Sequence, residues 1–137
     1  MANPGSLMRG RKGLVMGIAN DRSLAWGIAR AVADQGAELA ITYQGDALKK
    51  RVEPLAAQLG QDFLLPADVT DKKSMDALFA TISERWGKLD FAIHAIAYSD
   101  KEELKGKYLH TSEENFLRSM HISCFSFTDL ARRCEPL

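Results

Sequence analysis

The sequence predicts a doubly wound α/β fold, in which helices cover both faces of a parallel sheet. Short apolar runs alternate with segments whose apolar residues recur at helical spacing, in units of about 25–30 residues. Units of this length are typical of parallel strands joined by right-handed helical crossovers. The length of 137 residues suits one domain. We therefore expect about four strands and four helices over residues 12–137, preceded by a loose leader over residues 1–11.

Composition and charge argue against several classes of function. The 18 basic and 18 acidic residues give no net charge and form no basic face, which disfavours nucleic acid or an anionic membrane as a partner. No apolar run approaches the roughly 18 residues that span a bilayer, and the N-terminus lacks a signal-peptide pattern. Cys124 and Cys134 fit neither a disulfide framework nor a C-x-x-C pair. We expect a cytoplasmic protein.

The first unit centres on the stretch from Gly13 to Gly27. Its apolar run, residues 14–16, predicts a buried strand, and Ser23 after the turn is a good helix N-cap. Such a turn aims backbone N–H groups at a phosphate, with Gly17 admitting the ligand and Gly27 letting the helix pack close to its strand. The expected buried face of the helix consists of Leu24, Ile28, Ala31 and Val32.

The glycine pattern of this turn is weak evidence by itself. It reads Gly17-x5-Ser23-x3-Gly27, with a hydroxyl where the usual G-x-G-x-x-G motif has its middle glycine. An ordinary strand–helix connection with a glycine in its turn explains the same residues. The later units must therefore decide between a phosphate-binding loop and a plain connection.

The second unit begins after Gly36, which is expected to end the first helix. Residues 37–43 predict a strand, and Asp46 is a candidate N-cap for a helix that closes at Gly60. Pro54 lies inside that helix, where its missing N–H predicts a kink or a restart. The apolar positions of this helix are Leu48, Val52, Leu55 and Leu59.

The third unit repeats the pattern. Residues 63–65 predict a strand, Thr70 or Asp71 is the expected N-cap of the next helix, and Gly87 ends that helix. The apolar positions of the helix are Met75, Leu78, Phe79, Ile82 and Trp86. We interpret Trp86, like Trp26 in the first helix, as a packing residue.

The fourth unit has a strand over residues 89–97 and a long polar loop over residues 98–110. Thr111 and Glu114 form a capping box for a last helix that runs to about Arg133. Its aligned apolar positions are Phe116, Met120, Cys124 and Phe127. A four-stranded sheet leaves this apolar face uncovered and the fourth strand at an edge.

The residues that end the strands fit a dinucleotide. Ligands of such sheets bind at the carboxyl ends of the strands, near the point where the strand order reverses. A dinucleotide needs phosphate donors after the first strand, a ribose partner after the second, an adenine partner after the third and small residues after the fourth. The residues at these places are Gly17, Gln44, Asp68 with Val69, and Ala95, Ile96 and Ala97.

Each assignment has a plainer alternative. Gln44 fits the ribose hydroxyls or merely begins a turn, and Asp68 fits the adenine amino group or caps the following helix. The basic run 49–51 could meet a 2′-phosphate, but it lies a turn or more into a helix, which favours NADH over NADPH. His94 among apolar neighbours is interpreted as a core histidine. His110 and His121 have no ligand partners at metal-site spacing, so no metal site is expected.

Several motifs in this order closely resemble one family. Along the chain they are Gly17-x5-Ser23-Leu24-Ala25-x-Gly27, AELAITYQ ending at Gln44, Asp68-Val69, HAIA starting at His94, and Ile122-Ser123-x-x-Ser126-Phe127. The chain resembles the bacterial enoyl-acyl-carrier-protein reductases of type II fatty-acid synthesis, a branch of the short-chain dehydrogenase/reductase superfamily with a Rossmann-like fold. The resemblance runs from about residue 9 to the end and looks like the N-terminal half of the family's usual length.

The resemblance implies an NADH site and a reaction. The residues it places at the cofactor are Gly17, Ser23, Leu24, Gln44, Asp68, Val69, Ala95, Ile96, Ala97 and Ile122. Tyr98 and Ser99 would border the acyl substrate. In the family, hydride passes from the nicotinamide to a trans-2-enoyl thioester on acyl carrier protein, and a tyrosine stabilises the enolate oxygen. The family also forms homotetramers through the region of the last helix.

The catalytic Tyr-x6-Lys pair of the family has no convincing match here. It belongs to a helix after a fifth strand, which is expected beyond Leu137. Tyr43 with Lys50, and Tyr98 with Lys105, have the right spacing, but neither pair lies on one continuous helix. The chain alone is therefore expected to be inactive. The alternative hypothesis is a non-catalytic nucleotide-binding or assembly module that is complete at residue 137.

Overall fold

The computed structural model describes residues 5–137, so the first four residues of the expected leader lie outside the described residues. The chain folds into two compact units. The first is formed by residues up to 95 together with Leu137, and the second by residues 96–136.

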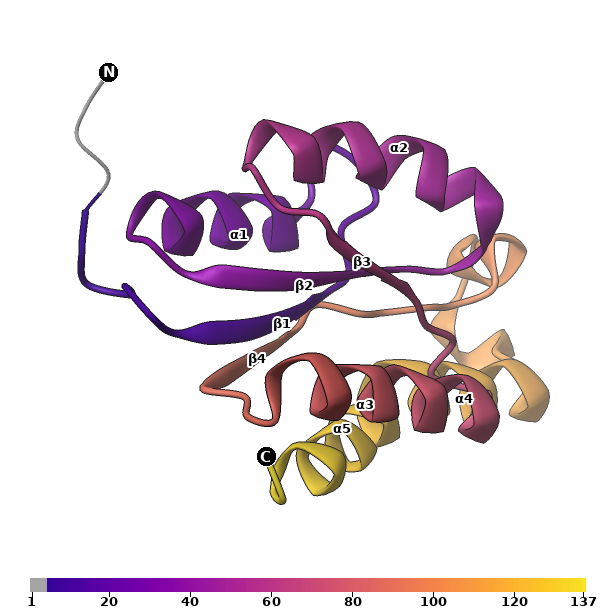
Figure 1. Ribbon diagram of the computed structural model, residues 1–137. Coiled ribbons are helices and arrows are strands. Elements are labelled where there is room, and N and C mark those ends of the chain that lie inside the picture. Colours follow the sequence, from indigo (N-terminus) through magenta and orange to yellow (C-terminus); the bar gives the residue numbers. More distant parts are fainter. Residues whose placement is uncertain (1–4) are drawn as a thin grey trace. The chain divides into compact units, whose positions relative to one another are not determined.

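The first unit is built on a parallel sheet of four strands in the order β3-β2-β1-β4 (Figure 1). Every pairing is parallel, with Leu14 of β1 opposite Ala40 of β2 and Ala92 of β4. The predicted doubly wound α/β fold is confirmed. The strands are β1 (Lys12–Met16), β2 (Glu38–Tyr43), β3 (Phe63–Pro66) and β4 (Phe91–His94).

Helices cover both faces of this sheet (Figure 1). The two helices α1 (Leu24–Asp34) and α2 (Gly45–Gln58) lie on one face, and α3 (Lys72–Trp86) lies on the other. Between α1, α2 and the sheet is a core of buried side chains: Val15, Ile18, Ala25, Trp26, Ala29, Ala37, Leu39, Ile41, Val52, Leu55 and Ala56. Burial of this apolar area is the main term that stabilises the unit.

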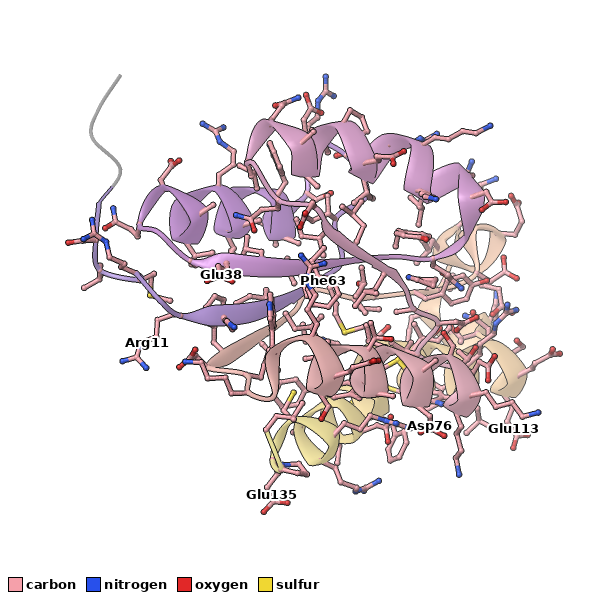
Figure 2. All side chains as sticks on the ribbon, in the orientation of Figure 1. Arg11, Glu38, Phe63, Asp76, Glu113 and Glu135 are labelled. Carbon is pink, nitrogen blue, oxygen red and sulfur yellow. The ribbon has the colours of Figure 1, made fainter. Side chains whose placement is uncertain are left out.

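The opposite face of the sheet is packed by α3. The predicted apolar positions Met75, Leu78, Phe79 and Ile82 are all buried. Phe63, labelled in Figure 2, meets Trp86 edge-on, with ring centroids 4.9 Å apart and planes at 79°. Asp71 is the N-cap of α3, and its side chain accepts a hydrogen bond from the amide of Lys73 at 2.9 Å.

The predicted buried face of α1 is wrong except at Val32, which is half-buried and packs against the core. Leu24 is 83% exposed and Ile28 is 38% exposed, whereas Ala25, Trp26 and Ala29 are buried. Two stripes on this helix satisfy helical spacing, and the stripe with two small alanines faces the sheet, because alanine lets the helix approach closely. Hydrophobicity alone favours the other stripe. Trp26 is the packing residue that was expected.

Gly27 does not serve close packing, contrary to the prediction. It is exposed, and a Cβ placed on it would meet no atom within 4 Å. Since Ala25 and Ala29 face the sheet, Gly27 points the other way.

The start of α2 also differs from the prediction. Its N-cap is Gln44, and Asp46 lies inside the first turn, where a carboxylate favours the positive end of the helix. The helix is continuous through Pro54 rather than restarting there. Pro54 and Lys50, whose carbonyl loses its donor, are both exposed, so water can satisfy that carbonyl. Gly36, Gly60 and Gly87 follow their helices with positive φ, as predicted.

Residues 5–11 are attached to the first unit. The amide of Met8 donates to the carbonyl of Gln35 at 2.9 Å, and its side chain packs against the core.

A cluster of charges follows at the amino ends of β1 and β4. The carboxylate of Asp90 accepts from the amide of Lys12 at 2.8 Å and from Arg11 Nη1 at 2.9 Å (Arg11 is labelled in Figure 2), and lies 3.2 Å from Lys88 Nζ. These donors, the backbone amide first, lower the pKa of Asp90 to about 2.

The second unit is largely helical. The expected loop over residues 98–110 contains two short 3₁₀ helices, Lys101–Leu104 and Tyr108–His110. The expected single helix is divided into α4 (Glu113–Met120), a π-helical turn (His121–Phe125) and α5 (Ser126–Cys134). Phe116, Met120, Cys124 and Phe127 are all exposed, so their apolar face is uncovered in this unit.

The predicted capping box of α4 is wrong by one residue. Ser112, not Thr111, is the N-cap, and its hydroxyl accepts a hydrogen bond from the amide of Asn115 at 3.2 Å. Glu103 reaches back from the first 3₁₀ helix and accepts from the amide and the hydroxyl of Ser112, both at 3.1 Å. The Glu103 carboxylate favours Ser112 over Thr111 as the N-cap of α4. Glu103 lies nine residues earlier in the sequence, so the capping-box spacing does not reveal this contact.

Candidate functional site

The turn after β1 is shaped by contact with the end of β4. Gly17 has a φ of +115°, and a Cβ on it would collide with the backbone carbonyl of Ala95. The amide of Ala95 donates to the carbonyl of Met16 at 3.0 Å. The structure therefore brings together two predicted site residues, Gly17 and Ala95, and the glycine is required by this approach of two backbones.

Ser23 closes the turn rather than capping α1 with its side chain. It is the N-cap residue by position, but its hydroxyl accepts hydrogen bonds from the amides of Ala19 at 2.9 Å and Asn20 at 3.1 Å. Asn20 in turn accepts from the amide of Arg22 at 2.8 Å. The Ser23 carbonyl accepts from the amide of Trp26 at 3.0 Å, but neither its carbonyl nor its hydroxyl binds the amides of Leu24 and Ala25, which leaves these two available to an anion at the helix start. Leu24 is exposed beside them.

The predicted ribose and adenine residues are in contact. Gln44 Nε2 donates to Asp68 Oδ2 at 3.3 Å. Asp68 Oδ1 accepts from the amide of Thr70 at 2.9 Å and from its hydroxyl at 2.6 Å, and the Thr70 hydroxyl is the main cause that lowers the pKa of Asp68. Asp68 is thus an ionised acceptor, while the helix cap is Asp71. Val69 is half-buried next to it.

The basic run after Gln44 is exposed. Lys49 Nζ lies 5.8 Å from the centroid of the Tyr43 ring, over the last residue of β2. Lys50 and Arg51 point along an exposed face of α2. Lys50 is therefore not the partner of Tyr43.

The remaining predicted residues belong to the second unit. Ile96 and Ile122 are half-buried, and Ala97 is exposed. The Tyr98 ring carries the guanidinium of Arg118 at 4.9 Å from its centroid. Lys105 pairs with Glu102 at 3.0 Å rather than with Tyr98. Lys105 thus pairs with a carboxylate, and the interpretation that the two Tyr-x6-Lys spacings are coincidences stays a prediction.

Two polar residues that sequence reasoning missed organise the second unit. Asn115 and Ser123 hydrogen-bond to the segment 98–100, and Asn115 also lines a cavity of about 480 Å³. The residues around that cavity are Ser99, Glu103, Leu104, Gly106, Tyr108, Thr111, Asn115, Phe116, Ser119 and Met120. The available signal for Asn115 was a carboxamide among the apolar positions of an amphipathic helix.

The histidines form no obvious centre. His94 is half-buried at the end of β4. Within residues 5–137, no group of three or more His, Cys, Asp or Glu side chains is arranged to hold a metal ion. No helix in the same range is both long and apolar enough to cross a membrane.

The family model for enoyl-(acyl carrier protein) reductase matches residues 17–137. The chain belongs to this family. The match includes the turn after β1, the strands β2, β3 and β4 and the whole second unit. The resemblance inferred from the motifs is therefore confirmed.

Members of the enoyl reductase family with high identity are known. The chain is 62% identical over 131 residues to an NADH enoyl-acyl-carrier-protein reductase of Rhizobium meliloti, covering 96% of this chain and 49% of that protein. A crystal structure of the enoyl reductase from Anaplasma phagocytophilum in complex with NAD matches with a TM-score of 0.94 and 58% identity, covering 97% of this chain and 51% of that one. The FabI structure from Candidatus Liberibacter asiaticus gives a TM-score of 0.95 at 50% identity, with coverage of 97% and 52%. The chain spans about half the length of these relatives.

Proposed function

We propose that the natural protein containing this chain reduces trans-2-enoyl thioesters on acyl carrier protein with NADH, in type II fatty-acid synthesis, and that this chain binds the cofactor. The observation that carries the proposal is the row of strand-end residues in the first unit. Gly17 and Ala95 meet at one place, and Gln44 and Asp68 meet at another. The 62% identity to an NADH-dependent reductase supports the same cofactor.

The residues of the first unit suit the parts of NADH. The turn closed by Ser23, and the amides of Leu24 and Ala25 at the start of α1, fit the pyrophosphate. Gln44 keeps its Oε1 as an acceptor for the ribose, because its Nε2 is occupied by Asp68. Asp68 is ionised and can accept from the adenine amino group, with Val69 against the ring.

We propose further contacts from the second unit. The cofactor residues assigned there are Ile96, Ala97 and Ile122, and Tyr98 and Ser99 border the acyl substrate. NADH supplies the hydride; the residues of this chain bind and orient it. No catalytic residue is assigned to this chain, since neither Tyr-x6-Lys spacing forms a pair. The basic run 49–51 is exposed and lies a turn or more into α2, which favours NADH over NADPH.

We also propose a cytoplasmic homo-oligomer. The large exposed apolar side chains on the helical part of the second unit support association: Phe116, Leu117, Met120, Phe125 and Phe127. A tetramer is the state that the family resemblance implies.

The deciding experiment measures NADH binding and NADH oxidation by the natural protein with a trans-2-enoyl thioester. We expect saturable binding and turnover that depends on the thioester. Gln44→Ala should weaken NADH binding roughly tenfold, since a lost hydrogen bond to a ligand costs about 1 kcal/mol and freeing Asp68 adds to it. Gln58→Ala, at the exposed end of α2, is the matched control and should leave affinity unchanged. Binding without turnover would instead support the nucleotide-binding module.

A further inference from the structure

Asn115 is a buried carboxamide at the start of α4 that uses both of its polar atoms. The residue is 9% exposed. Its Oδ1 accepts hydrogen bonds from the amide of Asp100 at 2.8 Å and from the hydroxyl of Ser119 at 3.3 Å, while Nδ2 lies 3.2 Å from Ser99 Oγ. Turning the carboxamide over would set its NH₂ against the N–H of Asp100. The contacts therefore allow one orientation only.

Ser123 holds the same segment one residue earlier. Its hydroxyl accepts from the amide of Tyr98 at 2.9 Å and donates to the carbonyl of Tyr98 at 3.2 Å. Asn115 and Ser123 thus bind both backbone groups of Tyr98, the hydroxyl of Ser99 and the amide of Asp100. Residues 98–100 lie outside any helix or strand but are hydrogen-bonded to helical residues. A segment held by a helix is positioned more precisely than a loop without such contacts.

The held segment follows the strand at which a ligand is expected. With the order β3-β2-β1-β4, the winding of the sheet reverses between β1 and β4, and residues 96–100 come directly after the carboxyl end of β4. Open parallel sheets bind their ligands at this reversal point. Under the proposed function, Tyr98 and Ser99 border the acyl thioester.

We propose that Asn115 is a positioning residue for the enoyl substrate. It fixes Ser99 and Asp100 so that the Tyr98–Ser99 segment meets the thioester in one geometry, and Ser123 fixes Tyr98. This inference rests on the proposed function. Asn115 makes no contact with NADH in this proposal. Replacing Asn115 should therefore change the kinetic constants for the thioester and leave the affinity for NADH unchanged.

The test is Asn115→Leu in the natural protein. Leucine keeps the volume of the side chain and removes all of its hydrogen bonds. We expect the KM for the trans-2-enoyl thioester to rise and kcat to fall, with kcat/KM lower by roughly tenfold to a hundredfold, as for a misplacement of about 1 Å. The Kd for NADH should stay within about twofold of the unchanged protein, because the cofactor residues are untouched.

A second readout follows the segment directly. Hydrogen exchange at the amide of Asp100 should accelerate in Asn115→Leu, because that amide loses its acceptor, whereas the amide of Tyr98 should stay protected by Ser123. Ser123→Ala should give the reverse pattern. Ser119→Ala is the matched control: the Ser119 hydroxyl donates to Asn115 Oδ1 but does not itself hold residues 98–100, so kcat/KM should be unchanged.

The outcomes separate the inference from the proposed function. If the wild-type protein is active and its Asn115→Leu variant keeps the same kcat/KM, the inference alone is overturned. Equal losses in thioester and NADH affinity also overturn it, because they indicate a general structural defect. If Asn115→Leu fails to fold, Asn115→Asp replaces it; this variant keeps an acceptor for the amide of Asp100, removes the donor to Ser99 and should raise the thioester KM about threefold. An unchanged protein that binds no NADH overturns the proposed function and the inference together.

Discussion

The two units of the chain are stabilised in different ways. In the first unit, buried apolar side chains from β1, β2, β3 and three helices form the core on both faces of the sheet, and the half-buried Phe91 and Ile93 of β4 pack against it. In the second unit, among the described residues, the buried ones are Leu130 and two polar residues, Asn115 and Ser126. Large apolar side chains of this unit are instead exposed. The first unit has the buried apolar core of an ordinary domain. The second unit is held together more by hydrogen bonds, and its large apolar side chains remain exposed.

The difference matters for function, because each unit carries a different part of the proposed site. The strand ends of the first unit sit on a packed core and suit a cofactor that must be held in a fixed place. The segment 98–100 of the second unit relies on Asn115 and Ser123. We expect substitutions in the core of the first unit to act mainly through folding, those at its strand ends through the cofactor, and those at Asn115 and Ser123 mainly through the substrate.

The largest expected effect is a loss of stability when a core residue of the first unit is replaced. Leu39 is 1% exposed in the centre of β2, and Leu39→Ala should lower the free energy of unfolding by about 2–5 kcal/mol, through lost burial and a residual cavity. Leu109→Ala, at a residue of the second unit that is 74% exposed and lies outside the proposed association surface, should change it by less than about 0.5 kcal/mol. Urea unfolding of both variants measures the contrast. Equal losses would contradict the expected dependence of stability on burial.

A smaller effect is expected at the turn after β1. Gly17→Ala should destabilise the protein by about 1–3 kcal/mol and weaken NADH binding, because alanine disfavours a φ of +115° and its Cβ collides with Ala95. Gly27→Ala is the control four residues into α1. Its Cβ would meet nothing within 4 Å, so alanine should stabilise the helix by about 0.4–1 kcal/mol. Thermal unfolding and NADH titration give both values. A neutral Gly17→Ala would contradict the close approach of the two backbones.

The smallest expected effect concerns acid. The pKa of Asp90 is lowered to about 2 and that of Asp68 is also lowered, and both residues belong to the first unit. A carboxyl whose folded pKa is lowered contributes stability above its ordinary pKa of about 4, and this contribution is lost as pH falls through the folded value. Stability should therefore decline between about pH 4 and pH 2.

Asp90→Asn sharpens this prediction. It removes the charge facing Arg11 and Lys88, so it should lower stability at neutral pH and flatten the decline in acid. Asp34→Asn, on the exposed side of α1, is the control and should keep the decline. Urea midpoints measured from pH 7 to pH 2 test both. A decline of unchanged steepness in Asp90→Asn would show that the cluster contributes nothing.

The sequence by itself determined the alternation of elements, their parallel pairing and the ends of the first three strands to within a residue, whereas the fourth strand, predicted over residues 89–97, ends at His94. These follow from local signals: apolar runs such as 14–16, helical spacing such as Met75 to Ile82, and glycines such as Gly87 that only a left-handed turn explains. Ordered motifs along the chain also identified the family. Each signal lies within a few residues, so no knowledge of distant contacts was needed.

Only the tertiary structure decided which side of α1 is buried and what the site residues do to one another. The stripe with Ala25 and Ala29 faces the sheet because closeness of packing outweighs the greater hydrophobicity of Leu24 and Ile28. The Gln44–Asp68 contact joins residues 24 apart in sequence, and the hold of Asn115 on Ser99 spans 16. Hydrogen bonds depend on distance and angle in three dimensions, which spacing along a chain does not fix.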